Sequence, residues 1–266
     1  MDITPPTTVQ SAFARAVVAD PTRPLITFYD DDTGERTELS GATMANWVAK
    51  TANLLVDGCA LEPAMIAAVR LPAHWQTAAV LLGCWAAGLA VDFDGTAGPL
   101  AAVSFVAADR LSELFTGETF STLASETRPD LAGLRSGGAE MFGMALAPLA
   151  GPMHPPPPDG VLDYVLEVRR HGDHFAALVP GDRETVAIAE EPPTTHGDLI
   201  TAAAFRAERG GLGPGARVLV DGDVYPDPVD WLVTPLVARA SVVLCRHLDN
   251  RKLQSRLIQE RATVWP

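Results

Sequence analysis

The pattern of apolar and polar residues repeats once along the chain. In the first copy, a helix-like stretch and a glycine–proline turn lead to the apolar run Met65–Val69, and a second helix-like stretch separates it from the apolar run 87–91. In the second copy, the corresponding apolar runs are Val218–Val220 and 240–244. A parallel pair of strands needs a crossover of about a dozen residues, usually a helix, so each copy predicts one βαβ unit. The sequence therefore predicts an α/β fold with two similar βαβ-containing subdomains and mostly parallel sheets.

Periodicity also predicts elements outside the repeat. A helix is expected near the amino end, and a hairpin is expected where two alternating runs flank the acidic segment 30–35. We interpret that segment as a solvated turn rather than a calcium site, because an EF-hand needs a longer loop with different ligand spacing. The region 100–150 is predicted to contain a strand over 103–107, a helix over 111–115 and a turn at 136–138.

The clearest break in the chain is the segment 153–160, which contains four consecutive prolines. Proline holds the backbone extended and cannot donate a hydrogen bond to a neighbouring strand. We interpret the segment as a linker or surface crossover, in preference to a ligand for an SH3-type domain. The predicted subdomains are therefore 1–152 and 161–266.

The chain is acidic, with a net charge of −13 and a pI near 4.8. Such a field repels the phosphates of nucleic acids and anionic lipids, so we expect no nucleic-acid partner. Of the 20 basic residues only Lys50 and Lys252 are lysines, which limits any mechanism that needs a mobile ammonium group.

Nothing in the pattern indicates a membrane or an oxidising compartment. The longest apolar stretch, Thr77–Val91, is shorter than the ~20 residues that span a bilayer, and the amino end lacks the features of a signal peptide. The cysteines are odd in number, widely spaced and set among apolar residues: Cys59, Cys84 and Cys245. They predict reduced, buried thiols rather than disulfides or a zinc site. We therefore expect a cytoplasmic protein.

Two groups of segments, taken in order, resemble one known superfamily. The first group is Thr37-Glu38-Leu39, Gly58, Leu71-Pro72-Ala73 and 86–91, and the second is 195–199, 211–220, 235–240 and 261–264. The first group resembles the N-terminal region of the adenylate-forming superfamily, which contains acyl-CoA synthetases, peptide-synthetase adenylation domains and luciferases. The second group is similar to the region after the ATP loop in those enzymes. This resemblance implies the N-terminal domain of that superfamily, which contains two similar α/β subdomains.

The chain departs from the superfamily at the ATP loop. Family enzymes carry a loop rich in serine, threonine and glycine that ends in Pro-Lys-Gly, because backbone N–H groups and a lysine hold the phosphates. The corresponding residues 179–191 contain one glycine, no lysine and four carboxylates. A like-charge contact at 4 Å costs ~1 kcal/mol in water and ~4 kcal/mol at an effective dielectric of 20. We therefore expect no nucleotide cofactor, although Arg183 supplies one positive charge.

The resemblance also implies segments that this sequence does not contain. Family enzymes continue past the position of Pro266 into an adenine-binding loop, a ribose-binding aspartate and a small domain with a catalytic lysine. Lys252 matches none of these positions. The resemblance therefore predicts the fold without the activity, as in a truncated, stand-alone actinobacterial type of unassigned function.

The leading hypothesis is a non-catalytic protein with a small-molecule pocket between its subdomains. The crevice at the carboxyl ends of parallel strands is the default place for a ligand in such folds. The candidate ligand-binding residues are Gly181, Asp182, Arg183, Thr194, Thr195 and His196. No catalytic residue and no metal site is assigned.

Two alternatives stay open. One is the N-terminal part of an ATP-dependent carboxylate-activating ligase, completed by a separate chain, which binds Mg-ATP or AMP. The other is a scaffold or interaction protein whose edge strand near Val264 pairs with a protein partner or with a second copy in a homo-oligomer.

Two local clusters are given structural interpretations. His171, His174 and His196 with Asp173 have the donor types of a metal site, but lone histidine clusters are weak motifs. The basic patch 169–175 is interpreted as an Arg–Asp network that fixes the entry to a strand, in preference to a site for a small anion or carboxylate.

Overall fold

The structure is a computed structural model that describes residues 5–96, 100–116, 134, 139–177 and 181–265. The helices in this part are α1 (Val9–Ala19), α2 (Gly41–Asn53), α3 (Trp75–Ala86), α4 (Ala108–Thr116), α5 (Tyr164–Val168), α6 (His196–Arg209), α7 (Thr234–Ala238) and α8 (Asn250–Glu260). The strands are β1 (Pro24–Asp30), β2 (Glu35–Ser40), β3 (Ile66–Arg70), β4 (Ala90–Asp92), β5 (Val103–Ala107), β6 (Glu140–Met144), β7 (Leu162–Asp163), β8 (Val186–Ile188), β9 (Thr194–Thr195), β10 (Arg217–Asp221), β11 (Ser241–Arg246) and β12 (Thr263–Val264). The predicted turn at 136–138 lies outside the described residues.

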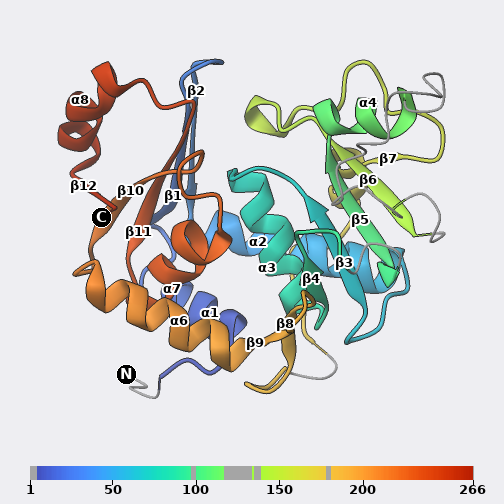
Figure 1. The fold of residues 1–266 in the computed structure, drawn as a ribbon, viewed down its shortest axis with the longest axis horizontal. Coiled ribbons are helices and arrows are strands. Elements are labelled where there is room, and N and C mark those ends of the chain that lie inside the picture. The colour runs from blue at the N-terminus through green and yellow to red at the C-terminus, as the bar shows by residue number, and fades with distance from the viewer. Residues whose placement is uncertain (1–4, 97–99, 117–133, 135–138, 178–180, 266) are drawn as a thin grey trace.

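The strands form two sheets, which lie on opposite sides of the molecule in Figure 1. Sheet A has five strands in the order β12-β10-β11-β1-β2. Sheet B has seven strands in the order β7-β6-β5-β3-β4-β8-β9. Neighbours are parallel except for the pairs β1–β2 and β8–β9, each of which is antiparallel. The predicted α/β class with mostly parallel sheets is confirmed.

Both predicted βαβ units are present. In the first, α3 connects β3 to β4, and Ala67 is paired with Val91 across the two parallel strands. In the second, a π-helical turn and α7 connect β10 to β11, and Leu219 is paired with Val243. Each unit lies in a different sheet, so the repeat in the sequence corresponds to a repeat in the structure.

The sheets do not follow the predicted division at 153–160. Sheet A takes β1 and β2 from before this segment and β10, β11 and β12 from after it. Sheet B likewise adds β7, β8 and β9 to four earlier strands. Strand β1 reaches its place in sheet A by pairing with β11, with Ile26 opposite Val242. A periodic pattern identifies a strand but not its distant partner, so the chain exchanges strands between the two predicted subdomains.

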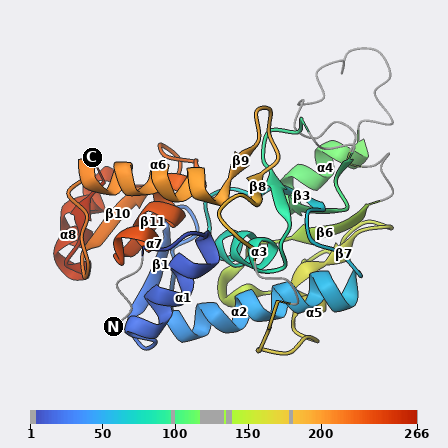
Figure 2. The same ribbon diagram turned by 90° about the horizontal axis from the view of Figure 1, so that it is seen from below.

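The shared core is built around α3. Every residue from Trp75 to Trp85 is buried, which agrees with the expectation of a buried helix. Helix α3 lies between the sheets in Figures 1 and 2, and α2 packs against it. A Cβ added at Gly83 would lie 2.5 Å from the Thr51 side chain. Glycine at this position therefore permits the close crossing of the two helices.

Helix α8 covers the outer face of sheet A (Figure 1). Its last residue, Glu260, accepts hydrogen bonds from Arg217 at 2.6 Å, from Arg36 at 3.1 Å and from the Tyr29 hydroxyl. After α8 the edge strand β12 pairs with β10 alone, and the side chain of Val264 is half exposed.

The three cysteines lie in two kinds of environment. Cys84 and Cys245 are buried and reduced, whereas Cys59 is only partly buried, so the prediction of a buried thiol was wrong there. Cys59 follows the π-helical turn that ends α2, near the surface, where the apolar spacing of the helix has already ended. Within the described ranges, none of the helices has both the length and the apolar character of a membrane span.

Candidate functional site

A cavity of about 580 Å³ lies between the carboxyl ends of strands in sheet B and the elements that face them. It is bounded by the ends of β3, β4 and β8, by α6 and by the loop after β10. Figure 2 shows α6 running from sheet A towards β8 and β9. The apolar part of its lining includes Val69, Leu71, Phe93, Ile188, Leu199 and Trp231. We call this cavity the crevice, and it occupies the position that α/β folds commonly use for ligands.

The crevice also lies where the connections of sheet B change direction. After β3 the chain moves to β4 on one side, and β5 then lies on the other side of β3. Residues that come after β3, β4 and β5 therefore converge on one opening, as Leu71, Phe93 and Arg110 do here. A change of direction of this kind leaves space above the strand ends.

Arg70, which lines the crevice, belongs to a buried ion pair. Arg70 and Asp92 are the last residues of β3 and β4, and their side chains are 0% exposed. The guanidinium contacts both the carboxylate and the main-chain carbonyl of Asp92. Because the two charges satisfy each other, the pair shapes the wall without offering a free charge to a ligand.

A second ion pair connects α6 to the loop after β10. Arg206 lies on the same face of α6 as Leu199 and Ala202, which also line the crevice. Its guanidinium lies 2.9 Å from the carboxylates of both Asp227 and Asp230. This contact joins the helix to the loop after β10 and to the π-helical turn Val229–Val233 that follows it.

Glu190 is the acid of the crevice that has no cationic partner among the described residues. Burial raises the pKa of its carboxyl, and the nearby carboxylates of Asp94, Asp92 and Asp227 raise it further, while the main chain of Phe93 partly opposes the shift. The carboxylate therefore lies in an environment that disfavours its negative charge.

Three of the six predicted ligand-binding residues, Gly181, Asp182 and Arg183, lie at a different place, in the turn that precedes β8. Asp182 Oδ1 accepts hydrogen bonds from the amides of Glu184 at 2.9 Å and Thr185 at 3.0 Å. It also accepts from the Thr185 hydroxyl at 3.1 Å, which lowers the pKa of the Asp182 carboxyl. The carboxylate of Asp182 thus takes the backbone donors that a phosphate would need, and Gly181 is the residue immediately before it.

The main-chain amides at the start of α6 are likewise occupied by acceptors of the protein. The amides of His196 and Gly197 donate to the carbonyls of Thr185 and Arg183, at 2.9 and 2.8 Å. Thr195 and Asp198 form a capping box, in which each side chain accepts from the main-chain amide of the other. The first turn of a helix binds anions through its free amides. Here the amides of the first turn already have acceptors within the protein. We call residues 181–198 the hairpin–helix junction.

The structure therefore separates the six predicted residues. Thr194 lines the crevice. Asp182, Thr195 and His196 are brought together at the hairpin–helix junction through the hydrogen bonds described above. The Arg183 side chain, also at the junction, is 63% exposed and pairs with Glu184 at 3.2 Å.

The side chain of His196 points from the junction into the protein core. Its side chain is buried, its ring packs edge-on against Trp85 with centroids 6.4 Å apart, and neither ring nitrogen has a hydrogen-bond partner in the described structure. Burial lowers the pKa of His196 to about 4, and the negative charge of Asp182 opposes the shift only in part. The imidazole is therefore neutral at physiological pH.

These features were compared with known proteins. No model of a protein family matches the chain. A protein of Mycobacterium tuberculosis described as a TIGR03089 family protein is 39% identical over 264 residues, which cover 98% of this chain and 99% of that protein. The chain belongs to the TIGR03089 family.

Solved structures confirm the resemblance in fold. The acyl-CoA synthetase of Brucella canis superposes with a TM-score of 0.69 at 14% identity over 97% of this chain and 46% of that enzyme. A fatty acyl CoA synthetase of Mycobacterium tuberculosis gives a TM-score of 0.64 at 12% identity over 96% and 48%. The anthranilate CoA ligase AuaEII, solved with anthranoyl-AMP, gives 0.64 at 13% identity over 89% and 44%. This chain thus spans about half the length of these enzymes.

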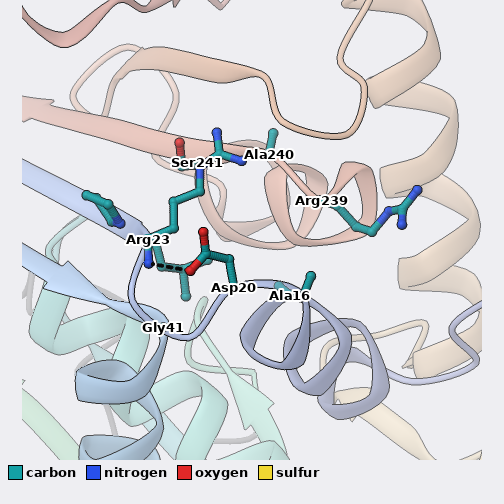
Figure 3. A pocket seen from close by; sticks show the side chains of 10 residues that line it. Ala16, Asp20, Arg23, Gly41, Arg239, Ala240 and Ser241 are labelled. Carbon is teal, nitrogen blue, oxygen red and sulfur yellow. Dashed lines mark hydrogen bonds between the residues drawn. The ribbon is translucent and has the colours of Figure 1, made fainter. Parts of the chain in front are cut away.

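A second, much smaller hollow lies at the amino ends of β1 and β11 in sheet A (Figure 3). Its volume is about 50 Å³, and Figure 3 shows Arg23 reaching towards Ser241 while Arg239 points away. Arg23 donates to the carbonyl of Gly215 at 2.6 Å, and Asp20 accepts from the amide of Arg23 at 3.1 Å. Arg23 and Asp20 are therefore already hydrogen-bonded within the protein.

The two clusters of basic and metal-binding residue types do not form sites. The described residues include no group of three or more side chains placed to hold a metal ion. His171 lies beside Gly58, whereas the ring of His196 packs against Trp85. Arg169 donates to the Ala150 carbonyl at 2.9 Å and Arg170 pairs with Glu167, so the predicted Arg–Asp network was wrong in its partners.

Sequence reasoning missed the charged residues of the crevice. Arg206 has a signal in the sequence, because it lies at helical spacing from Leu199 and Ala202 on one face of α6. Arg70 and Asp92 end two parallel strands, which places their side chains at one edge of the sheet. Glu190 has no such signal, because its place depends on how β8 pairs with β4.

Proposed function

We propose that this protein binds a small molecule in the crevice and does not activate it through ATP. The observation that carries the proposal is the crevice itself, a cavity of about 580 Å³ with mostly apolar walls and a few charged groups. Volumes of about 300–1,000 Å³ with such a lining are typical of small-molecule sites. The likeness to acyl-CoA synthetases supports the fold that places the crevice there.

The hairpin–helix junction supports the second half of the proposal. Transfer of a nucleotidyl group needs donors that hold the phosphates of ATP. In the junction the amides of Glu184, Thr185, Gly197 and Asp198 have internal acceptors, and carboxylates surround them. Bound phosphates would have to displace these hydrogen bonds and approach like charges.

The test is a fragment screen by ligand-observed NMR with a matched pair of variants on α6. Ala202 lines the crevice, whereas Ala204 is exposed and does not. We expect Ala202→Trp to abolish binding of the fragments that the wild type binds and Ala204→Trp to leave it unchanged. Fragment binding that survives Ala202→Trp contradicts the proposal.

Calorimetry with Mg-ATP and with AMP tests whether the protein binds the nucleotide that activation of a ligand would need. We expect no heat of binding at millimolar nucleotide. Micromolar binding favours the alternative, in which the chain is the N-terminal part of an ATP-dependent ligase.

A further inference from the structure

Two of the guanidinium groups that line the crevice are paired with carboxylates. Arg70 is bound to Asp92, and Arg206 is bound to Asp227 and Asp230. Arg110, which approaches from α4, also has an interaction within the protein. A negatively charged ligand would have to compete with these internal acceptors.

Glu190 is in the opposite situation. It lines the crevice from the turn after β8 and is only partly exposed. The charges that act on it most are other carboxylates, namely Asp92 and Asp94 at the end of β4 and Asp227 in the loop after β10. Asp92 and Asp227 are already paired with Arg70 and Arg206, so an additional positive charge would be attracted mainly by Glu190 itself and by Asp94.

We propose that the ligand of the crevice is an organic cation, a primary amine on an apolar body, with its ammonium group against Glu190. This inference rests on the proposed function of the crevice. The apolar body would lie against side chains such as Phe93, Leu199 and Trp231, which line the same cavity. The ammonium would donate a charge-assisted hydrogen bond to a carboxylate that lacks a cationic partner among the described residues.

Three indole compounds of equal shape and different charge test the proposal: tryptamine, tryptophol and indoleacetate. At neutral pH the first is a cation, the second is neutral and the third is an anion. By calorimetry with the full chain, we expect tryptamine to bind at least about tenfold more tightly than tryptophol, and indoleacetate to bind most weakly.

A matched pair of variants locates the effect. Glu190→Gln keeps the shape of the side chain and removes its charge, and we expect it to weaken tryptamine binding about tenfold or more while leaving tryptophol unchanged. Glu191→Gln, at the exposed neighbouring acid, should change neither affinity. Equal effects of the two variants on tryptamine overturn the proposal.

The pH dependence of the wild type gives a measurement that needs no variant. Burial and the neighbouring acids raise the pKa of Glu190 above its usual value. Tryptamine remains charged in acid, so its affinity should fall as the pH drops through the pKa of Glu190, whereas that of tryptophol should not. A pH-independent affinity for tryptamine overturns the proposal.

Failure of this proposal is distinguishable from failure of the proposed function. If neutral fragments bind in the crevice and Ala202→Trp blocks them, but tryptamine binds no better than tryptophol, only the cationic ligand is excluded. If no fragment binding depends on residue 202, the crevice is not the ligand site and both proposals fail.

Discussion

Helix α6 borders both the hairpin–helix junction and the crevice, and these two regions differ in whether their polar groups are free to meet a ligand. At the junction, the amides of Glu184, Thr185, Gly197 and Asp198 donate to acceptors of the same segment. In the crevice, one turn further along the helix, the side chains surround a cavity of about 580 Å³. A shared fold can therefore preserve the space for a ligand independently of the donors that hold phosphate.

The largest expected effect concerns the wall of the crevice. Asp92→Ala removes the partner of Arg70 and leaves a buried guanidinium without its carboxylate. We expect a loss of about 3–5 kcal/mol in the free energy of unfolding, measured by urea denaturation. Glu38→Ala, which breaks the exposed contact with Arg36, should cost no more than about 1 kcal/mol. A similar cost for both variants would mean that the wall does not depend on the buried pair.

Acid should act next most strongly, through His196 at the junction. Burial lowers its pKa in the folded protein to about 4 from an ordinary value of 6.5. Between these values the unfolded chain binds a proton that the folded protein does not, so stability is complete above pH 6.5 and falls as the pH decreases towards 4. The loss attributable to this group is at most about 3 kcal/mol.

The variant His196→Leu tests this contribution by urea denaturation at several pH values. It should flatten the acid limb of the stability curve relative to the wild type. His74, whose pKa burial lowers to about 3, contributes a loss of the same sign in the wild type and in the variant. An unchanged slope in His196→Leu would show that this histidine is not held neutral.

A third prediction tests how closely the two sheets approach beside the crevice. A Cβ added at Gly222, just after β10, would lie 2.6 Å from the Cβ of Ala73. Gly222→Ala should therefore destabilise the protein by about 1–3 kcal/mol. The second change Ala73→Gly should restore part of this loss. Gly213→Ala, at a glycine with open space around its Cβ position, is the control. Equal thermal midpoints for Gly222→Ala and Gly213→Ala would contradict the close contact.

The smallest expected effect separates two adjacent threonines. Thr195→Ala removes the cap of α6 and should cost about 1 kcal/mol of stability without changing the affinity of a crevice ligand. Thr194→Ala should do the reverse, because Thr194 lines the crevice and caps no helix. If each variant lowered both the stability and the ligand affinity, the junction and the crevice would not be independent.

The sequence predicts local elements of this fold well and their distant pairing poorly. The runs around Val69 and Val220 have the length, flanking turns and crossover helices of parallel strands, so both βαβ units could be predicted. Nothing in the pattern near Ile26 shows that it faces Val242 rather than a nearer strand. Pairing over such a separation is decided by packing of the whole core.

At the candidate site, too, local features could be predicted and contacts between distant segments could not. Residues 179–191 lack the composition of a phosphate loop, and this could be seen at once. That Asp182 accepts from its own turn is a matter of local chemistry, since aspartate commonly binds amides two or three residues ahead. The place of Glu190 beside Asp94 and Asp227 requires three segments to meet, which a single sequence does not show.

The decisive experiment is a pair of titrations monitored by amide NMR of uniformly nitrogen-labelled protein, one with Mg-ATP and one with a fragment selected in the screen. The amides of Glu184, Thr185 and Gly197 report on the junction, and those of Thr194 and Ala202 report on the crevice. We predict that the fragment shifts the crevice signals, and that millimolar Mg-ATP leaves the junction signals in place. Saturable shifts of the junction amides at micromolar Mg-ATP would contradict the proposal that the crevice binds its ligand without ATP.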